Sequence, residues 1–299
     1  MTTRRRFLTI LAGAGVLPIL GQSAQSAIPE WRGIALGAEA RLILDHPQAD
    51  RILKLAVSEI HRLEGLFSLY RADSELSRLN RNGVLVSPSP DMLALLSICG
   101  RMHARTAGAF DPTIQSLWSL YAQHASRGTM PDAGALDAAL AQTGWDKLVV
   151  RPDKITATSD GLGLSLNGVA QGFIADKVTQ LLRNEGMSNA LVNTGEIAAL
   201  GQSPNGQPWQ VTLPGPKGRM VDLKNKAIAS SSALGTTFDQ RGTVGHILDP
   251  RTGRPSARGG TVTVIAETAA EADALSTAAC LMSETDINAA KRDCVILFG

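Results

Sequence analysis

Two oxygen-bearing side chains in "EADALSTAAC" are spaced to bind a hard cation. On a helix, Asp273 and Thr277 lie four residues apart and therefore on one face. A carboxylate with a hydroxyl suits Mg²⁺, which takes one or two protein ligands and completes its octahedron with water and substrate phosphates. An aspartate near a helix start can also serve only as a cap or dipole partner. The alanines around Asp273 favour the metal site, because an unpaired carboxylate is costly in apolar surroundings.

The stretch "LNGVAQG", residues 166–172, has the composition of a phosphate-binding turn. A strand that ends at Leu166, a turn through Asn167-Gly168 and a helix that starts near Ala170 would present backbone N–H groups at a helix N-terminus. Glycines there allow an anion to come close. Strand-to-helix turns with glycine also serve packing alone, so the pattern by itself leaves both interpretations open.

A histidine and an aspartate stand in two further polar turns. His246 in "GTVGHILDPRTGRP" can act as a general base, and it can equally be a partly buried structural imidazole. Asp111 in "AGAFDPT" precedes a proline, where an aspartate caps a turn or accepts a hydrogen bond from a ligand.

The elements that position these residues follow from periodicity and turn signals. The pattern predicts an α-rich first part followed by a mixed part, and hence one α+β domain with a helical subregion. We expect helices over 52–67, 90–106, 132–144, 172–186 and 271–282, a hairpin within 148–166 that turns at Asp160-Gly161, and strands within 189–201, 208–215, 226–232, 260–267 and 294–298.

The amino-terminal segment 1–26 is typical of an export signal. Three arginines precede an apolar run that is shorter than the ~20 residues of a membrane span, and Phe-Leu follows the arginines as in twin-arginine signals. We therefore expect an exported, periplasmic protein whose residues 27–299 form a single domain. Without the segment, 26 basic residues face 27 acidic ones, a net charge of −1, which gives a nucleic-acid partner no support.

The three cysteines, Cys99, Cys280 and Cys294, have no metal-binding spacing and lie in apolar runs. They are best interpreted as small buried hydrophobic residues. Cys280 with Cys294 is the one pairing worth testing as a disulfide in an exported protein.

Six motifs together resemble the FAD:protein FMN transferases of the ApbE family. In order they are "FSLYRADSELSRLN" (67–80), "GAFDPT" (108–113), "LNGVAQGFIAD" (166–176), "LVNTGEIAALG" (191–201), "GHILDPRTGRP" (245–255) and "EADALSTAACLM" (271–282). The resemblance covers nearly all of residues 27–299. It implies an α+β fold with a central, mostly antiparallel sheet and helices around a ligand cleft.

The same resemblance implies an activity. Such an enzyme binds FAD and Mg²⁺, cleaves the pyrophosphate, attaches FMN through a phosphodiester to a threonine or serine of an acceptor flavoprotein, and releases AMP. The alternatives are a Mg²⁺-dependent FAD pyrophosphatase, which would release FMN and AMP into solution, and a non-catalytic FAD-binding protein. A structural module of the cell envelope would leave the motifs unexplained.

The resemblance also implies roles for single residues. His246 is the expected base, and Asp273 is expected to be both catalytic and a metal ligand. Thr277 and a backbone carbonyl of the 168–170 turn, from Gly168 or Ala170, would complete the metal ligands. The residues expected to bind FAD are Tyr70, Ala109, Phe110, Asp111, Asn167, Gly168, Gln171, Gly195, Glu196 and Ile247.

Several positions depart from the commoner family residues and remove charge from the expected cleft. They are Gln171, Ser165, Thr194 and the run "SSSALGTTF" (230–238). Together with the twin-arginine signal, they resemble a subgroup associated with maturation of nitrous oxide reductase. Its acceptor is a membrane-anchored regulator with an extracytoplasmic FMN-binding domain.

Overall fold

A seven-stranded sheet forms the centre of the molecule. The structure is a computed structural model that describes residues 9–10, 29–214 and 218–299. All neighbouring strands of this sheet pair antiparallel, which confirms the predicted α+β class with a central antiparallel sheet. In spatial order the strands are β13 (Val295–Phe298), β12 (Thr261–Ala266), β11 (Ala227–Ser232), β8 (Ile197–Leu200), β7 (Ala190–Asn193), β3 (Ala38–Leu44) and β2 (Glu30–Ala35).

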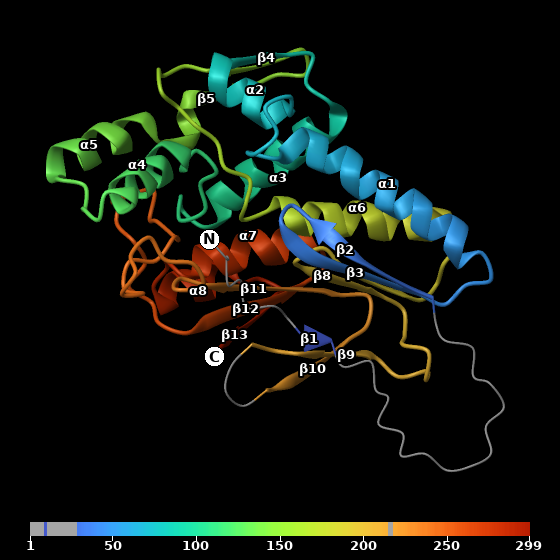
Figure 1. Cartoon of the computed structure of the whole chain (residues 1–299). Coiled ribbons are helices and arrows are strands. Elements are labelled where there is room, and N and C mark those ends of the chain that lie inside the picture. Colours follow the sequence, from blue (N-terminus) through green and yellow to red (C-terminus); the bar gives the residue numbers. More distant parts are fainter. Residues whose placement is uncertain (1–8, 11–28, 215–217) are drawn as a thin grey trace.

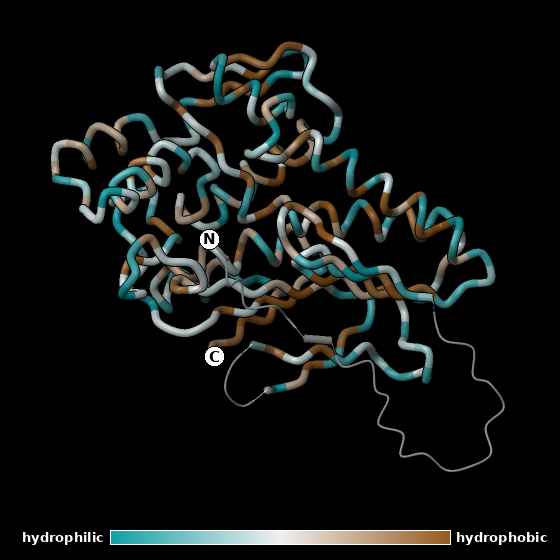
Figure 2. Tube along the Cα trace, viewed as in Figure 1, coloured by the Kyte–Doolittle hydropathy of each residue, from teal (hydrophilic) through white to brown (hydrophobic). Residues whose placement is uncertain are grey.

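Three helices cover one face of this sheet, as Figure 1 shows: α1 (Ala49–Phe67), α6 (Ala170–Asn184) and α7 (Ala269–Ala279). On α1, the predicted inward residues Ile52, Ala56, Ile60, Leu63 and Phe67 recur every three or four positions and are buried. Hydrophobic residues run along the sheet and along α6 (Figure 2), so the main core lies between the helices and the strands.

A smaller layer covers the opposite face. It consists of β9 (Trp209–Thr212) and β10 (Met220–Leu223), with β1 (Thr9–Ile10) paired to β9. The Trp209 indole is buried against the sheet, and its Nε1 donates a hydrogen bond to the Leu200 carbonyl at 3.0 Å. The predicted signal, 1–26, lies outside the described residues except for the two residues of β1.

A helical region stands beside α6 and α7 and forms one side of the site described below (Figure 1). Ser89 and Asp132 cap the two predicted helices of this region, α3 (Pro90–Arg105) and α5 (Ala133–Gln142), through their side chains. The elements of this region are α2 (Glu75–Asn82), β4 (Val84–Val86), α3 (Pro90–Arg105), α4 (Gln115–Ser126), α5 (Ala133–Gln142), the short 3₁₀-helix η1 (Trp145–Lys147), β5 (Leu148–Val150) and β6 (Lys154–Ala157). The last helix of the chain, α8 (Glu284–Ala290), follows α7 and is not part of this region.

The predicted hairpin at Asp160-Gly161 is wrong. The chain reverses between β5 and β6 instead, where Arg151 and Lys154 exchange backbone hydrogen bonds. The leucines after Gly161 are buried, but in the part of the chain that the structure describes their segment forms no strand and makes only a short bridge to residues 112–115. The side-chain amide of Asn80 donates to the Leu164 carbonyl and accepts from the Leu164 N–H, both at 2.8 Å, and so takes the place of a neighbouring strand.

Two other expectations need correction. The chain does not begin with helices, because β2 and β3 precede α1. The predicted strand within 189–201 is two strands, β7 and β8, joined by a turn at Gly195, whose φ of 106° lies in the left-handed region that favours glycine. The other predicted helices and strands occur within a few residues of their expected limits.

The cysteines are free thiols and buried in the described part of the chain, as predicted. Burial raises the pKa of Cys280 to about 12, so this thiol is protonated at neutral pH. No helix within the described ranges is both long and apolar enough to span a bilayer.

Candidate active site

A cleft of about 370 Å³ opens between the helical region and the carboxyl end of β11. It gathers the residues that the sequence singled out, although they come from six separate segments of the chain. The predicted site residues that line it are Tyr70, Ala109, Phe110, Asp111, Asn167, Gly168, Gln171, Gly195, Glu196, His246, Ile247, Asp273 and Thr277. Ala170, the first residue of α6, is buried and does not line the cleft.

Asp273 and Thr277 face the cleft from α7, as the four-residue spacing predicts. The Asp273 carboxylate is 4% exposed and accepts a hydrogen bond at 3.2 Å from the N–H of Gly172 in the first turn of α6. A buried carboxylate held by a backbone donor keeps a fixed position. The aspartate is therefore more than a helix cap.

The two glycines of "LNGVAQG" permit close contacts within the protein. A Cβ on Gly172 would lie 2.3 Å from the carbonyl oxygen of Ala269, so α6 and α7 can cross only with glycine there. A Cβ on Gly168 would lie 3.0 Å from Thr277 Oγ1, which brings the backbone of the turn beside that hydroxyl. Gly172 thus serves helix packing, and Gly168 serves the site.

The helix N-terminus itself offers fewer donors to an anion than the sequence suggests. The N–H groups of Val169 and Ala170 both bond to the Leu166 carbonyl, and that of Gly172 bonds to Asp273. The predicted use of this turn as an open set of phosphate donors is therefore wrong for these three groups. The close approach of Gly168 to Thr277 remains.

A short chain of hydroxyls supports Thr277. Ser231 Oγ in β11 lies 2.7 Å from Ser276 Oγ and 3.3 Å from Thr277 Oγ1. Ser231 also lines the cleft. Sequence reasoning missed this contact, although the run of serines at 230–232 was its visible signal.

His246 lines the same cleft and lies in an irregular hairpin, in which Thr237 pairs antiparallel with Gly245. Its Nδ1 is 3.0 Å from the Thr236 carbonyl oxygen, to which a ring N–H can donate. That tautomer places the proton on Nδ1 and makes Nε2 the proton-accepting nitrogen. The preceding Gly245 is required for the turn, because a Cβ there would lie 2.1 Å from the Ala233 carbonyl oxygen.

Gln171 is a buried amide with an unsatisfied donor. The side chain is 7% exposed and lines the cleft, and its Nε2 has no hydrogen-bond partner in the part of the chain that the structure describes. Such a donor is costly unless a ligand accepts from it. Thr194 donates its hydroxyl proton to the Gln171 backbone carbonyl at 2.8 Å.

Asp111 and Tyr70 both line the cleft, but Asp111 is held by hydrogen bonds within the protein and Tyr70 is exposed to solvent. Asp111 accepts hydrogen bonds from the N–H and hydroxyl of Thr113 and from the N–H of Trp145. Its carboxylate therefore caps a turn, which is the first of the two roles that the sequence suggested. Tyr70 is 87% exposed. An exposed ring on a cleft wall is suited to stack against a planar ligand.

Asp176, in the last position of the motif 166–176, holds α7 in place. Its two carboxylate oxygens accept hydrogen bonds from the N–H groups of Ala269 and Ala270 at 2.7 and 2.9 Å. Burial raises the pKa of Asp176 to about 6, although those hydrogen bonds act to lower it. The sequence offered no role for this residue.

The raised pKa predicts a pH-dependent stability. The folded state binds the proton at higher pH than the unfolded state, whose carboxyl titrates near 3.9. The contribution of Asp176 to the free energy of unfolding is therefore full below pH 4 and falls by about 3 kcal/mol as pH rises to 6. Urea unfolding of the wild type and Asp176→Asn between pH 4 and 8 should show their difference changing in that window. Asp160→Asn, at an exposed position, is the control; a constant difference for Asp176→Asn would contradict the assignment.

The donor set suits a hard cation rather than a zinc-type site. Residues 9–10, 29–214 and 218–299 contain no cluster of three or more His, Cys, Asp or Glu side chains that could hold a metal. The carboxylate of Asp273, the hydroxyl of Thr277 and the backbone of Gly168 instead provide a few oxygen donors beside an open cleft. This is the pattern expected for Mg²⁺ bound with water and phosphate.

Comparisons with known proteins cover both the sheet and the helical region. The ApbE family model matches residues 36–295. A protein from Salmonella typhimurium named FAD:protein FMN transferase is 31% identical over 261 residues, which are 81% of this chain and 73% of that protein. The apo flavinyl transferase ApbE from Pseudomonas stutzeri matches with a TM-score of 0.79 and 27% identity, over 91% of this chain and 92% of that one. An ApbE protein from Thermotoga maritima matches with a TM-score of 0.79 and 27% identity, over 91% and 94%.

Proposed function

Because the chain belongs to the ApbE family, we propose that it transfers the FMN part of FAD to a threonine or serine of an acceptor flavoprotein in a Mg²⁺-dependent reaction. It is a flavin transferase, as its curated relatives are named. The observation that carries the finer proposal is the cleft itself, in which the oxygen donors Asp273 and Thr277 and the imidazole of His246 line one cavity.

Asp273, Thr277 and the Gly168 carbonyl are the residues that would hold Mg²⁺. The bound ion would supply positive charge to the phosphoryl oxygens of FAD. On the protein side, the hydrogen bond from Gly172 fixes the Asp273 carboxylate, and Ser231 orients the Thr277 hydroxyl. These contacts set the ligand positions before substrate arrives.

The transfer exchanges one phosphate ester bond for another. The acceptor hydroxyl oxygen attacks the phosphorus on the FMN side, the bond between that phosphorus and the bridging pyrophosphate oxygen breaks, and AMP leaves with the bridging oxygen. His246 takes the hydroxyl proton on Nε2, while Nδ1 stays directed at the Thr236 carbonyl. His246 can therefore accept the proton without a rotation of its ring.

The remaining cleft residues are suited to bind FAD. The buried Nε2 of Gln171 can donate to a carbonyl or ring nitrogen of the ligand, and the exposed ring of Tyr70 can stack on one of its planar groups. Glu196, 8% exposed, accepts from the N–H of Ser230 at 3.3 Å and forms part of the floor.

The decisive test follows the two products together. Incubating the protein with FAD, Mg²⁺ and an acceptor domain that carries a flavinylation threonine should increase the acceptor mass by one FMN phosphoryl group and release AMP in equal amount. AMP without a modified acceptor, in the presence of several acceptor domains, would indicate a FAD pyrophosphatase. Bound FAD without either product would indicate a carrier.

Ser231→Ala is expected to weaken Mg²⁺ binding without disturbing the fold. If Thr277 holds Mg²⁺, its hydroxyl oxygen would bind the ion, and the hydroxyl proton could then be donated in a hydrogen bond to Ser231 Oγ, which lies 3.3 Å from Thr277 Oγ1. Loss of such an outer partner typically costs about tenfold or more in metal affinity. Calorimetric titration of Mg²⁺ in the presence of bound FAD measures this affinity, with Ser203→Ala, in a turn that does not line the cleft, as the control. Unchanged affinity would make the serine a packing residue only.

We also propose that the protein acts outside the cytoplasm, after export directed by residues 1–26 as a twin-arginine signal, with 27–299 as the working domain. The motif departures support an acceptor related to nitrous oxide respiration, a membrane-anchored regulator with an FMN-binding domain. Co-production with that domain and mass analysis of it test the assignment. An acceptor that never gains FMN there, while other acceptors do, would exclude the subgroup.

A further inference from the structure

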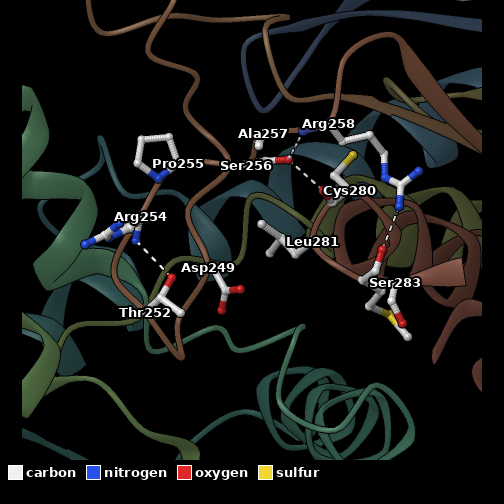
Figure 3. Close-up of a pocket in the computed structure, with 11 residues that line it drawn as sticks. Asp249, Thr252, Arg254, Pro255, Ser256, Ala257, Arg258, Cys280, Leu281 and Ser283 are labelled. Atoms are coloured by element: carbon white, nitrogen blue, oxygen red, sulfur yellow. Dashed lines mark hydrogen bonds between the residues drawn. The ribbon is translucent and has the colours of Figure 1, made fainter. Parts of the chain in front are cut away.

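A second cavity, of about 470 Å³, lies next to the active-site cleft and has no part in the chemistry described above (Figure 3). Leu281 lines both cavities, and Pro250 of the cleft adjoins Asp249 of the second one. We call this second cavity the arginine pocket. It is lined by Asp249, Thr252, Arg254, Pro255, Ser256, Ala257, Arg258, Cys280, Leu281, Met282 and Ser283.

The arginine pocket carries uncompensated positive charge. Its one acidic lining residue, Asp249, binds Arg251 through both carboxylate oxygens, at 2.9 and 2.8 Å. Within the described ranges, no ion pair joins Arg254 or Arg258 to an acidic side chain. The two arginines lie on opposite sides of the pocket in Figure 3, with Leu281 between them.

Arg258 is held in position by the protein. Its Nη2 donates to the Met282 carbonyl at 2.6 Å, and its guanidinium lies over the Phe298 ring at 5.2 Å. Its Nε is buried and has no hydrogen-bond partner in the part of the chain described. Ser256 fixes the same loop, because its hydroxyl donates to the Cys280 carbonyl and accepts from the Arg258 N–H. The Arg258 guanidinium therefore has a fixed position, whereas a surface arginine without such contacts moves freely.

We propose that the arginine pocket binds an acidic side chain of the acceptor protein, close in its sequence to the modified threonine or serine. The inference rests on the proposed function, because only a protein acceptor must extend beyond the cleft. An acceptor segment that delivers its hydroxyl to His246 and leaves the cleft past Leu281 enters the arginine pocket. Arginines recognise carboxylates through paired hydrogen bonds, and Arg254 and Arg258 are the charged donors that line this pocket.

The test uses threonine-centred twelve-residue peptides, each with one aspartate at a different distance from the threonine, and matched peptides with asparagine. With the full chain, FAD and Mg²⁺, the aspartate is expected to raise kcat/KM for FMN incorporation about tenfold at one or two positions, and less at high salt. Arg254→Glu and Arg258→Gln should abolish this preference while the KM for FAD stays unchanged. Arg151→Glu, an exposed arginine of the β5–β6 turn that lines neither cavity, should keep the preference.

A binding measurement makes the outcome independent of turnover. In NMR titrations of the full chain, the best aspartate peptide should shift the amides of 249–258 and 280–283, and neither its asparagine counterpart nor the Arg254→Glu protein should show the effect. Because Arg254 is exposed and its side chain has no hydrogen bond among the described contacts, this variant tests the pocket even where Arg258→Gln is unstable.

Equal binding and equal transfer for both peptide types would overturn the inference and leave the transferase intact. A KM for FAD that rises in both pocket variants would assign the pocket to the phosphates of FAD and also overturn it. Peptide binding without FMN incorporation or AMP would count against the proposed function alone.

Discussion

Asp273→Asn is expected to lower the rates of FMN transfer and of AMP release by about a thousandfold, with the fold retained. The substitution keeps the size of the side chain and an oxygen that accepts from the Gly172 N–H, and it removes the charge that would hold Mg²⁺. A thousandfold loss corresponds to about 4 kcal/mol of transition-state stabilisation, which is in the range attributed to a bound metal ion. The measurement is the rate of product formation at saturating FAD across a range of Mg²⁺ concentrations.

The matched control for this change is Asp160→Asn, the same loss of charge at an exposed position. Asp273→Ala should be equally inactive and also less stable by about 1–3 kcal/mol, because the buried N–H of Gly172 then has no acceptor. A variant Asp273→Asn that keeps Mg²⁺-dependent turnover within tenfold of the wild type would contradict the metal assignment.

Local periodicity was sufficient to predict the helices that carry a single apolar face. In α3, Met92, Leu95, Leu96 and Cys99 follow helical spacing, and all are buried as expected. The strands β2 and β3 give a weaker signal, because both faces of β3 are buried over part of its length and its residues do not alternate. Helices therefore dominated the expectation for the first part of the chain.

The failed hairpin shows the limit of turn signals. Asp160-Gly161 followed by alternating leucines is a strong local indication of a strand pair. The partner of Leu164, however, is the side-chain amide of Asn80, which lies 84 positions earlier in the sequence. A local sequence pattern indicates that a backbone segment needs hydrogen-bond partners. Which groups provide them depends on the tertiary fold.

The sequence indicated which residues share a cleft, but not the contacts that hold them there. The resemblance of the six motifs to the ApbE family, rather than any motif alone, identified the residues that line the cleft. The roles of Gly172 and Asp176 emerge only where α6 crosses α7, because one accommodates the Ala269 carbonyl and the other accepts from the first N–H groups of α7. Neither role has a local signature in a single sequence.

His246→Ala is expected to lower the rate of FMN transfer by about a hundred- to ten-thousandfold while the affinity for FAD stays unchanged. The hydrogen bond from Nδ1 to the Thr236 carbonyl fixes Nε2 as the proton acceptor, and the loss of a general base has this magnitude. Pre-steady-state transfer onto the acceptor, with FAD affinity measured by flavin fluorescence, separates the two quantities.

Two comparisons distinguish a base from a structural imidazole at this position. Added imidazole should restore part of the rate to His246→Ala if the missing function is proton transfer, and it should not do so if the ring only supports the hairpin through Thr236. His61→Ala, which removes an exposed histidine of α1, is the matched control. Transfer within tenfold of the wild type, with an unchanged pH profile, would assign His246 a structural role, and the acceptor hydroxyl would then have to lose its proton to water.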